Sequence, residues 1–272
     1  MARHRGASDA THKGRYPPSV EPPVHHSASR RSPEGLEGPA GAGPDPVRYI
    51  GDPVEKVIAS FDSRIIRLYS RGRFTILREV FLEEIGQYLP RTGRVLDLGC
   101  GFGFFSLYFA AREPGREMFG IDLNARRIAD ANTAALRMGL ENAHYEVRDA
   151  AEWDSEETFD AAYILDLLHH LPEREVAPFL GRLRARLRPG GTLIVKEVED
   201  RPRWKMWFTL LLDRLMVGWR EPIHYWPPAE MIALLEGLGF DVKKHSMRDW
   251  LPYPHVLYVC RLQEPAGESP GP

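Results

Sequence analysis

The chain has 272 residues, 43% of them hydrophobic and 27% charged, and its formal net charge at pH 7 is −2. This length allows one large domain or two small ones, and the near-neutral charge gives no reason to expect a nucleic-acid partner. Cys100 and Cys260 are too few for a disulfide framework or a cysteine metal site. No apolar run resembles a signal peptide or reaches the ~20 residues of a membrane span. We therefore expect a cytoplasmic protein with reduced cysteines.

Both ends of the chain are poor in large apolar residues. Residues 1–52 are rich in Pro, Gly, Ser and Ala, and residues 264–272 have a similar composition. Such segments cannot bury enough surface to offset the entropy lost on ordering, so we expect two disordered tails. The first half of the N-terminal tail is basic, which fits either weak contact with an anionic surface or a plain solvated tail.

Between the tails, apolar residues first recur at helical spacing at 54–70 and 74–89, which predicts N-terminal helices in a cap at 53–90. From residue 91 onward, strand and helix patterns alternate. The predicted strands cover residues 94–99, 117–123, 143–149, 159–168, 191–198, 240–249 and 255–262. The predicted helices cover residues 104–112, 124–139, 173–187 and 228–239. This order predicts an α/β fold over 91–263: a doubly wound, mostly parallel seven-stranded sheet with helices on both faces and a C-terminal antiparallel hairpin.

The stretch VLDLGCGFGFF joins the first of these strands to a glycine loop. Gly99, Gly101 and Gly103 follow the strand, at the edge of a doubly wound sheet where ligands bind. A dinucleotide loop has the pattern G-x-G-x-x-G, and here Phe104 stands in the place of the third glycine. Asp97 adds a negative charge before the loop, which suits an ammonium group better than a phosphate. The loop therefore disfavours a pyrophosphate ligand.

VLDLGCGFG resembles the D-x-G-x-G-x-G loop of class I S-adenosylmethionine-dependent methyltransferases that act on small molecules. GIDL, VRDAAEW, FDAAYILDLLHHLP and LRPGGTLIV follow in the order of that family's motifs. The resemblance implies S-adenosylmethionine as cofactor, with Asp122 accepting from the ribose hydroxyls and Asp149 from the adenine amino group. The cofactor-binding residues that it implies are Asp97, Gly99, Gly101, Gly103, Asp122, Leu123, Asp149, Ala150 and Asp166. Each aspartate alone also has a structural reading, as a turn cap or a strand end.

The segment LDLLHHLP follows the fourth predicted strand, where this family presents the methyl group. His170, and after it His169, are the candidate general bases, because an imidazole titrates near neutral pH and a hydroxyl acceptor gains by losing its proton. Alternatively, one ring only shapes the cofactor pocket. Asp166 in the same loop is a candidate for orienting the methionine end of the cofactor. The loops offer no cluster of Asp and Asn ligands, so we expect no metal.

Residues 199–226 form an apolar insert that contains the segment RWKMWFTLLLDRLMVGW. In the family it resembles, inserts at this point commonly form a substrate lid, and a lid as apolar as this one would favour a lipophilic acceptor. The same segment would also suit peripheral contact with a bilayer, packing against the N-terminal helices, or burial in a homodimer. On those helices Tyr69, Arg71 and Arg73 either close over the site, bind an acidic group, or form a solvated face.

The leading hypothesis is methyl transfer from S-adenosylmethionine to a small, lipophilic acceptor, with a hydroxyl group as the expected target. Two alternatives stay open. One is an NAD(P)-dependent oxidoreductase of the same fold class, which the glycine spacing and Asp97 disfavour. The other is a non-catalytic protein that binds S-adenosylmethionine or a partner through the apolar insert.

Overall fold

The computed structural model of the chain describes residues 52–150, 152, 156–198, 226–247 and 255–263. The expected tails at 1–52 and 264–272 and the expected insert at 199–226 lie outside the described residues, apart from Asp52 and Trp226. No helix in these described ranges is long and apolar enough to cross a membrane.

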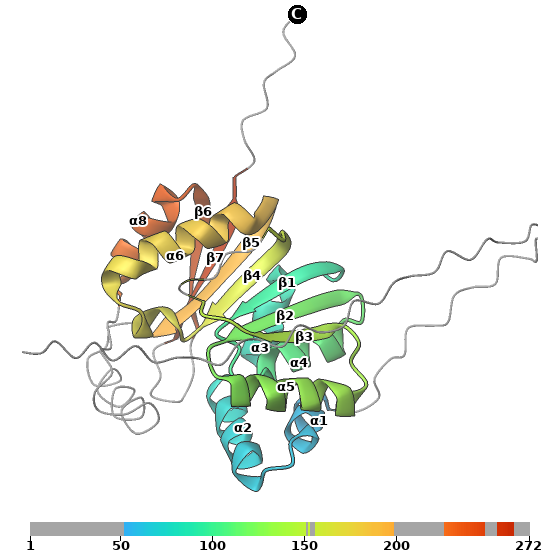
Figure 1. Cartoon of the computed structure of the whole chain (residues 1–272). Helices are drawn as coiled ribbons and strands as arrows, with labels where there is room; N and C mark the ends of the chain where they lie inside the picture. The colour runs from blue at the N-terminus through green and yellow to red at the C-terminus, as the bar shows by residue number, and fades with distance from the viewer. Residues whose placement is uncertain (1–51, 151, 153–155, 199–225, 248–254, 264–272) are drawn as a thin grey trace, which may run out of the picture. The chain divides into compact units, whose positions relative to one another are not determined.

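Seven strands form one sheet in the order β3-β2-β1-β4-β5-β7-β6 (Figure 1). The strands are β1 (Gly93–Leu98), β2 (Arg116–Asp122), β3 (Ala143–Val147), β4 (Phe159–Leu165), β5 (Leu187–Val198), β6 (Phe240–Met247) and β7 (His255–Leu262). The pairs that join β1 to β5 are parallel, whereas β7 runs antiparallel to both β5 and β6. The predicted doubly wound sheet with its closing antiparallel hairpin is therefore confirmed.

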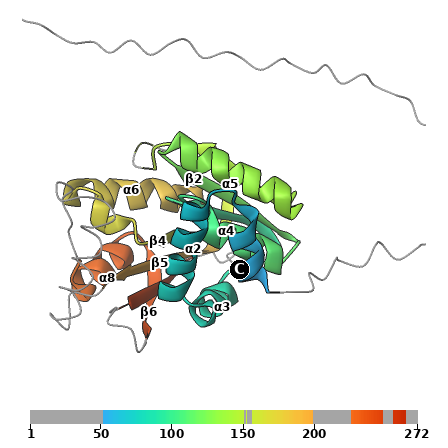
Figure 2. The same ribbon diagram turned by 90° about the horizontal axis from the view of Figure 1, so that it is seen from below.

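Helices cover both faces of this sheet. They are α1 (Pro53–Ser60), α2 (Arg64–Ile76), α3 (Glu79–Tyr88), α4 (Phe104–Arg112), α5 (Ala125–Met138), α6 (Glu173–Arg186) and α8 (Pro228–Gly237), with a short 3-10 helix, η1 (Leu168–His170). One core joins α1, α3, α4 and α5 to one face, and a second core joins α6 and α8 to the other. Figures 1 and 2 show these two groups of helices on opposite sides of the strands. Because both faces are covered, the central strands are nearly continuous in apolar residues.

The N-terminal region differs from the predicted pair of helices, because it forms three. The side chain of Ser63 accepts a hydrogen bond from the backbone N–H of Ile66 at 3.4 Å and begins a new helix after Phe61. Such a cap satisfies an N–H group that the first helical turn leaves without a partner. Asp52, placed in the expected tail, caps α1 in the same way through Val54.

Strand β5 begins four residues earlier than predicted, at Leu187. Phe159 of β4 pairs with Leu187, and Ala161 pairs with Thr192, so β5 contains an irregularity between the two pairs. Gly190 lies in it with a φ of 72°. The predicted strand begins only after Pro189 and Gly190, whereas the structure incorporates both in an irregular stretch that precedes the regular part of the strand.

Candidate active site

A cavity of about 490 Å³ lies at the carboxyl ends of the central strands. Its walls include Asp97 of β1, Asp122 at the end of β2, Leu165 at the end of β4 and Val198 at the end of β5. The strand order reverses between β1 and β4, so the cavity lies where doubly wound sheets bind their ligands.

Two positions of the glycine loop need glycine for different reasons. At Gly101, φ is 57° and an added Cβ atom would find no atom within 4 Å, so the backbone faces open space. At Gly103, φ is 71° and an added Cβ would lie 2.7 Å from Cε1 of Tyr145. Close packing at Gly103 thus sets α4 against β3, while Gly101 leaves the backbone open to a ligand.

Asp97 supplies a buried carboxyl group to the cavity. Its side chain is 4% exposed, and its Oδ2 accepts a hydrogen bond from the hydroxyl of Tyr163 at 2.8 Å. Burial raises the pKa of Asp97 to about 7, although the hydrogen bond from Tyr163 acts in the opposite direction. A cationic group in the cavity would favour the ionised form, so Asp97 suits a ligand that carries an ammonium group.

Asp122 holds two backbone segments at the end of β2. Its Oδ2 accepts from the N–H of Gly101 at 3.0 Å, and its Oδ1 accepts from the N–H of Asn124 at 2.8 Å. Each carboxylate oxygen has a further lone pair for a second hydrogen bond. Asp122 can therefore accept from a pair of hydroxyl groups while it orders the glycine loop.

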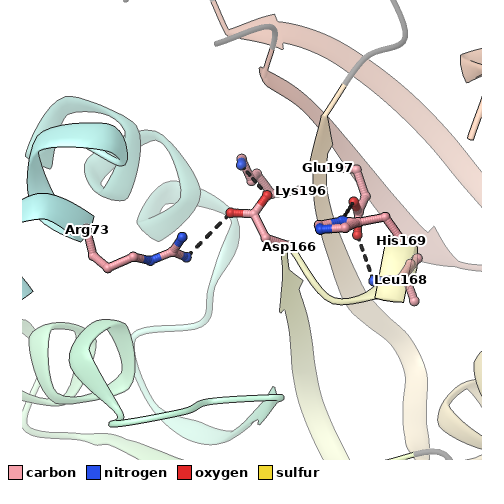
Figure 3. Close-up of polar contacts among 6 residues, drawn as sticks. All are labelled: Arg73, Asp166, Leu168, His169, Lys196 and Glu197. Carbon is pink, nitrogen blue, oxygen red and sulfur yellow. Dashed lines mark hydrogen bonds and ion pairs between the residues drawn. The ribbon is translucent and has the colours of Figure 1, made fainter. Parts of the chain in front are cut away.

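Asp166 lies in the loop after β4 and joins two cations (Figure 3). Its carboxylate forms ion pairs with the buried Nζ of Lys196 and, at 3.4 Å, with Nη2 of Arg73 on α2. Its own N–H donates to the carbonyl of Lys196 at 3.0 Å, and its φ of 59° is rare for a non-glycine residue. Burial would raise the pKa of Asp166, but the charges of Lys196 and Arg73 hold it well below its ordinary value. Asp166 is thus ionised and paired with both cations.

His169 contacts a buried carboxylate from the neighbouring strand. Its Nδ1 lies 2.6 Å from Oε2 of Glu197, and the two side chains are 2% and 6% exposed. The other oxygen of Glu197 accepts from the N–H of Leu168 at 2.8 Å, so one carboxylate holds both the ring and the start of η1 (Figure 3). His170 is half-buried beside it, with the ring centroids 4.1 Å apart, and both rings line the cavity.

Helix α2 and the glycine loop supply an apolar wall. Ile66, Tyr69, Arg73 and Ile76 lie three or four positions apart on one face of α2 and line the cavity. Aromatic rings complete this wall: Phe102 from the loop, and Phe104 and Phe105 from the first turn of α4. Of the three residues named on these helices, Tyr69 and Arg73 face the site, whereas Arg71 is exposed and forms an ion pair with Glu55 at 3.7 Å.

The cavity brings together Asp97, Gly99, Gly101, Asp122, Asp166, His169 and His170. The other four candidates lie outside its described wall. Gly103 packs on Tyr145, Leu123 is exposed, Asp149 is half-buried, and Ala150 is buried in the core on the α6 side of the sheet. Residues 151 and 153–155, next to the expected adenine contacts, are outside the described ranges, so the roles of Asp149 and Ala150 stay predictions. The described residues hold no group of three His, Cys, Asp or Glu side chains able to bind a metal ion.

Sequence reasoning missed Lys196 and Glu197. Both lie at the carboxyl end of β5, in the segment GTLIVKEV. Two charged residues in a central strand that is otherwise apolar are costly to bury without partners. That pattern was the available signal, because the carboxyl ends of such strands carry the ligand site.

Known proteins resemble the chain at the level of sequence and of fold. The sequence profile of a family described as "Methyltransferase domain" matches residues 69–245, which is more than half of the chain. A ubiquinone biosynthesis O-methyltransferase of Aeromonas salmonicida is 26% identical over 207 residues, which cover 72% of this chain and 85% of that protein. A trans-aconitate 2-methyltransferase of Pseudomonas paraeruginosa is 31% identical over 136 residues, which cover 49% of this chain and 45% of that protein.

Among solved structures, a DhpI–SAH complex superposes with a TM-score of 0.56 at 20% identity and covers 77% of this chain and 97% of that one. At this identity the likeness concerns the fold. Together with the family match over most of the described core, it settles the classification. The chain belongs to the methyltransferase-domain family and has the fold of the class I S-adenosylmethionine-dependent methyltransferases.

Proposed function

We propose that this methyltransferase transfers the methyl group of S-adenosylmethionine to a hydroxyl group of a small, lipophilic acceptor, with a histidine of η1 as general base. One arrangement carries this proposal. His169 and His170 line the same cavity as Asp97, Asp122 and the glycine loop, so a proton acceptor adjoins groups suited to the cofactor.

The polar groups of the cavity match the polar groups of S-adenosylmethionine. Asp122 accepts from the ribose hydroxyls, and the backbone at Gly101 lies beside them because its N–H donates to Asp122. Asp97 receives the ammonium group. Arg73 is the cation for the methionine carboxylate, and Asp166, which was expected to orient this end directly, acts by holding Arg73 in place.

S-adenosylmethionine, when bound, supplies an electrophilic methyl group whose bond to sulfur breaks with the electron pair left on sulfur. The histidine takes the proton of the acceptor hydroxyl as the oxygen bonds to the methyl carbon. The apolar side chains of α2 and the phenylalanines of the loop and of α4 would shield these groups from water once the ligands are bound, which would strengthen the charge interactions in the site.

Two features favour a lipophilic hydroxyl over a carboxylate acceptor, although one relative is named for trans-aconitate. A carboxylic acid with a pKa of ~4 is already ionised at neutral pH and needs no base, whereas a phenol with a pKa of ~10 does. A buried His169 paired with Glu197 would serve only the second class. The aliphatic and aromatic wall of α2 likewise suits an apolar ring or chain.

Incubation with methyl-labelled S-adenosylmethionine tests this function. The acceptors are a hydrophobic phenol series, matched carboxylic acids and an extract of the source organism. We expect label in an ether product, together with one S-adenosylhomocysteine per methyl group transferred. Label found only in esters would reject the hydroxyl acceptor. S-adenosylhomocysteine formation at the blank rate with every acceptor would favour the non-catalytic alternative.

A further inference from the structure

We propose that Glu197 is a positioning residue that makes His169, rather than His170, the general base. Its carboxylate keeps the proton of the neutral ring on Nδ1, so that Nε2 is the atom that accepts the proton of the acceptor hydroxyl. This inference rests on the proposed function, which it deepens by assigning the proton-transfer atom.

The contacts of Glu197 define the direction of each hydrogen bond. The N–H of Leu168 can only donate, so Oε1 of Glu197 accepts it at 2.8 Å. Oε2 lies 2.6 Å from Nδ1 of His169, and a carboxylate can only accept, so Nδ1 carries the hydrogen. In a neutral imidazole the other nitrogen, Nε2, is then an acceptor.

Burial protects the hydrogen bond between Glu197 and His169 from competition by water. Both His169 and Glu197 are buried, so water competes weakly for either group. In such surroundings a carboxylate behind a histidine fixes its tautomer and stabilises the imidazolium that forms when it takes a proton; the serine-protease triad illustrates the same logic. The bond to Leu168 also keeps η1 in register with β5, so the ring and its support stay together.

The other charged groups near His169 leave this role to Glu197. The carboxylate of Asp166, three positions before His169, is already ion-paired with Lys196 and Arg73. Successive residues of a strand point to opposite faces, which is why Lys196 and Glu197 serve different partners. Among the residues that the structure describes, His170 also contacts the ring of His169, with the two centroids 4.1 Å apart.

Glu197→Gln tests the inference with almost no change in shape. The carboxamide oxygen can still accept from Leu168, but its NH₂ group then donates to Nδ1, so the hydrogen of His169 moves to Nε2. We expect kcat to fall by ~100-fold or more, while the Kd for S-adenosylmethionine changes less than about twofold. Glu236→Gln, an exposed change of the same type on α8, is the control and should leave both quantities unchanged.

Nitrogen-15 NMR of the histidine rings in the ligand-free protein gives a readout that does not depend on turnover. We expect His169 to be the Nδ1–H tautomer in the wild type and the Nε2–H tautomer in Glu197→Gln, with peaks assigned through His169→Gln. An Nε2–H tautomer in the wild type, or a variant kcat within threefold of wild type, would overturn the role of Glu197. If kcat falls further in His170→Gln than in His169→Gln, the general base is His170 instead.

A different result would reject the proposed function itself. If the wild type transfers no methyl group to any acceptor, the reaction itself is rejected, whereas the NMR tautomer still reports whether Glu197 orients His169. Should Glu197→Gln not fold, the wild-type tautomer alone decides the inference.

Discussion

Arg73 of α2 and Asp166 of the loop after β4 lie 3.4 Å apart, although 93 positions separate them in the sequence. Their side chains are 20% and 17% exposed, so this ion pair is largely removed from solvent. The pair joins an N-terminal helix to the strand ends that form the cavity. Helix α2 is thereby part of the site.

Replacing Arg73 should therefore weaken cofactor binding more than replacing a neighbouring arginine. We expect Arg73→Gln to lower the affinity for S-adenosylmethionine by about 1.5–3 kcal/mol, the usual value for a hydrogen bond to a charged group. Arg71→Gln is the matched control, because Arg71 is 56% exposed and its pair with Glu55 is a surface contact. Titration calorimetry measures both, and equal affinities for the two variants would reject a cofactor role for Arg73.

The pKa of Asp97 predicts a pH dependence of cofactor binding. Because burial raises this pKa to about 7, the free protein holds a proton on Asp97 below pH 7. An ammonium group favours the carboxylate, so binding below pH 7 releases that proton, and affinity rises with pH until about 7.

We expect S-adenosylhomocysteine to bind about tenfold more weakly at pH 6 than at pH 7.5, since one pKa unit corresponds to a factor of ten. Calorimetry in buffers of different ionisation enthalpy counts the released proton. Asp97→Asn should bind more weakly, and its affinity should lose this pH dependence. A wild-type affinity that stays constant over the same range would contradict the assignment of the ammonium group to Asp97.

The two glycines should respond differently to alanine. Gly103→Ala combines a left-handed φ with a clash against Tyr145, so we expect it to lower the free energy of unfolding by about 2–5 kcal/mol. Gly101→Ala meets open space and should cost about 1–2 kcal/mol from its φ alone, yet it should impair cofactor binding. Urea unfolding monitored by circular dichroism gives both values. A larger loss for Gly101→Ala would be inconsistent with these packing roles.

Asp122→Asn should weaken S-adenosylmethionine binding by about 1–3 kcal/mol, because the carboxamide nitrogen can accept neither from a backbone N–H nor from a ribose hydroxyl. Asp241→Asn, an exposed change on edge strand β6, provides the control and should bind as the wild type does. Calorimetric Kd values for the pair test the ribose role, and an unchanged Kd for Asp122→Asn would remove it.

The sheet could be predicted from the sequence because its signals are local. Strands β1 to β4 are apolar runs bounded by glycines or acids, and their predicted starts lie within one residue of the observed ones. The glycine loop and Asp122 were found for the same reason, since each directly follows or ends a strand. The break between α1 and α2 was missed, because the cap at Ser63 outweighs a helical apolar pattern that continues through it.

The side-chain partners within the site could not be predicted. Glu197 reaches His169 across 28 positions, and this contact exists only because β5 lies beside β4 in the sheet. The sequence placed His170 before His169 as the candidate base. Two adjacent imidazoles cannot be distinguished without knowing which side chains contact each of them. Arg73 was one of three ambiguous polar residues, and its place at the cavity follows from how α2 packs.

The side chains of this cavity predict that it binds S-adenosylmethionine for methyl transfer. Calorimetric titration of the full chain with S-adenosylmethionine, and separately with NADH, tests it most directly. We predict saturable one-to-one binding of S-adenosylmethionine that Asp97→Asn and Asp122→Asn both weaken, and no heat from NADH. Tight NADH binding with no response to S-adenosylmethionine would instead identify the cavity as a nicotinamide site.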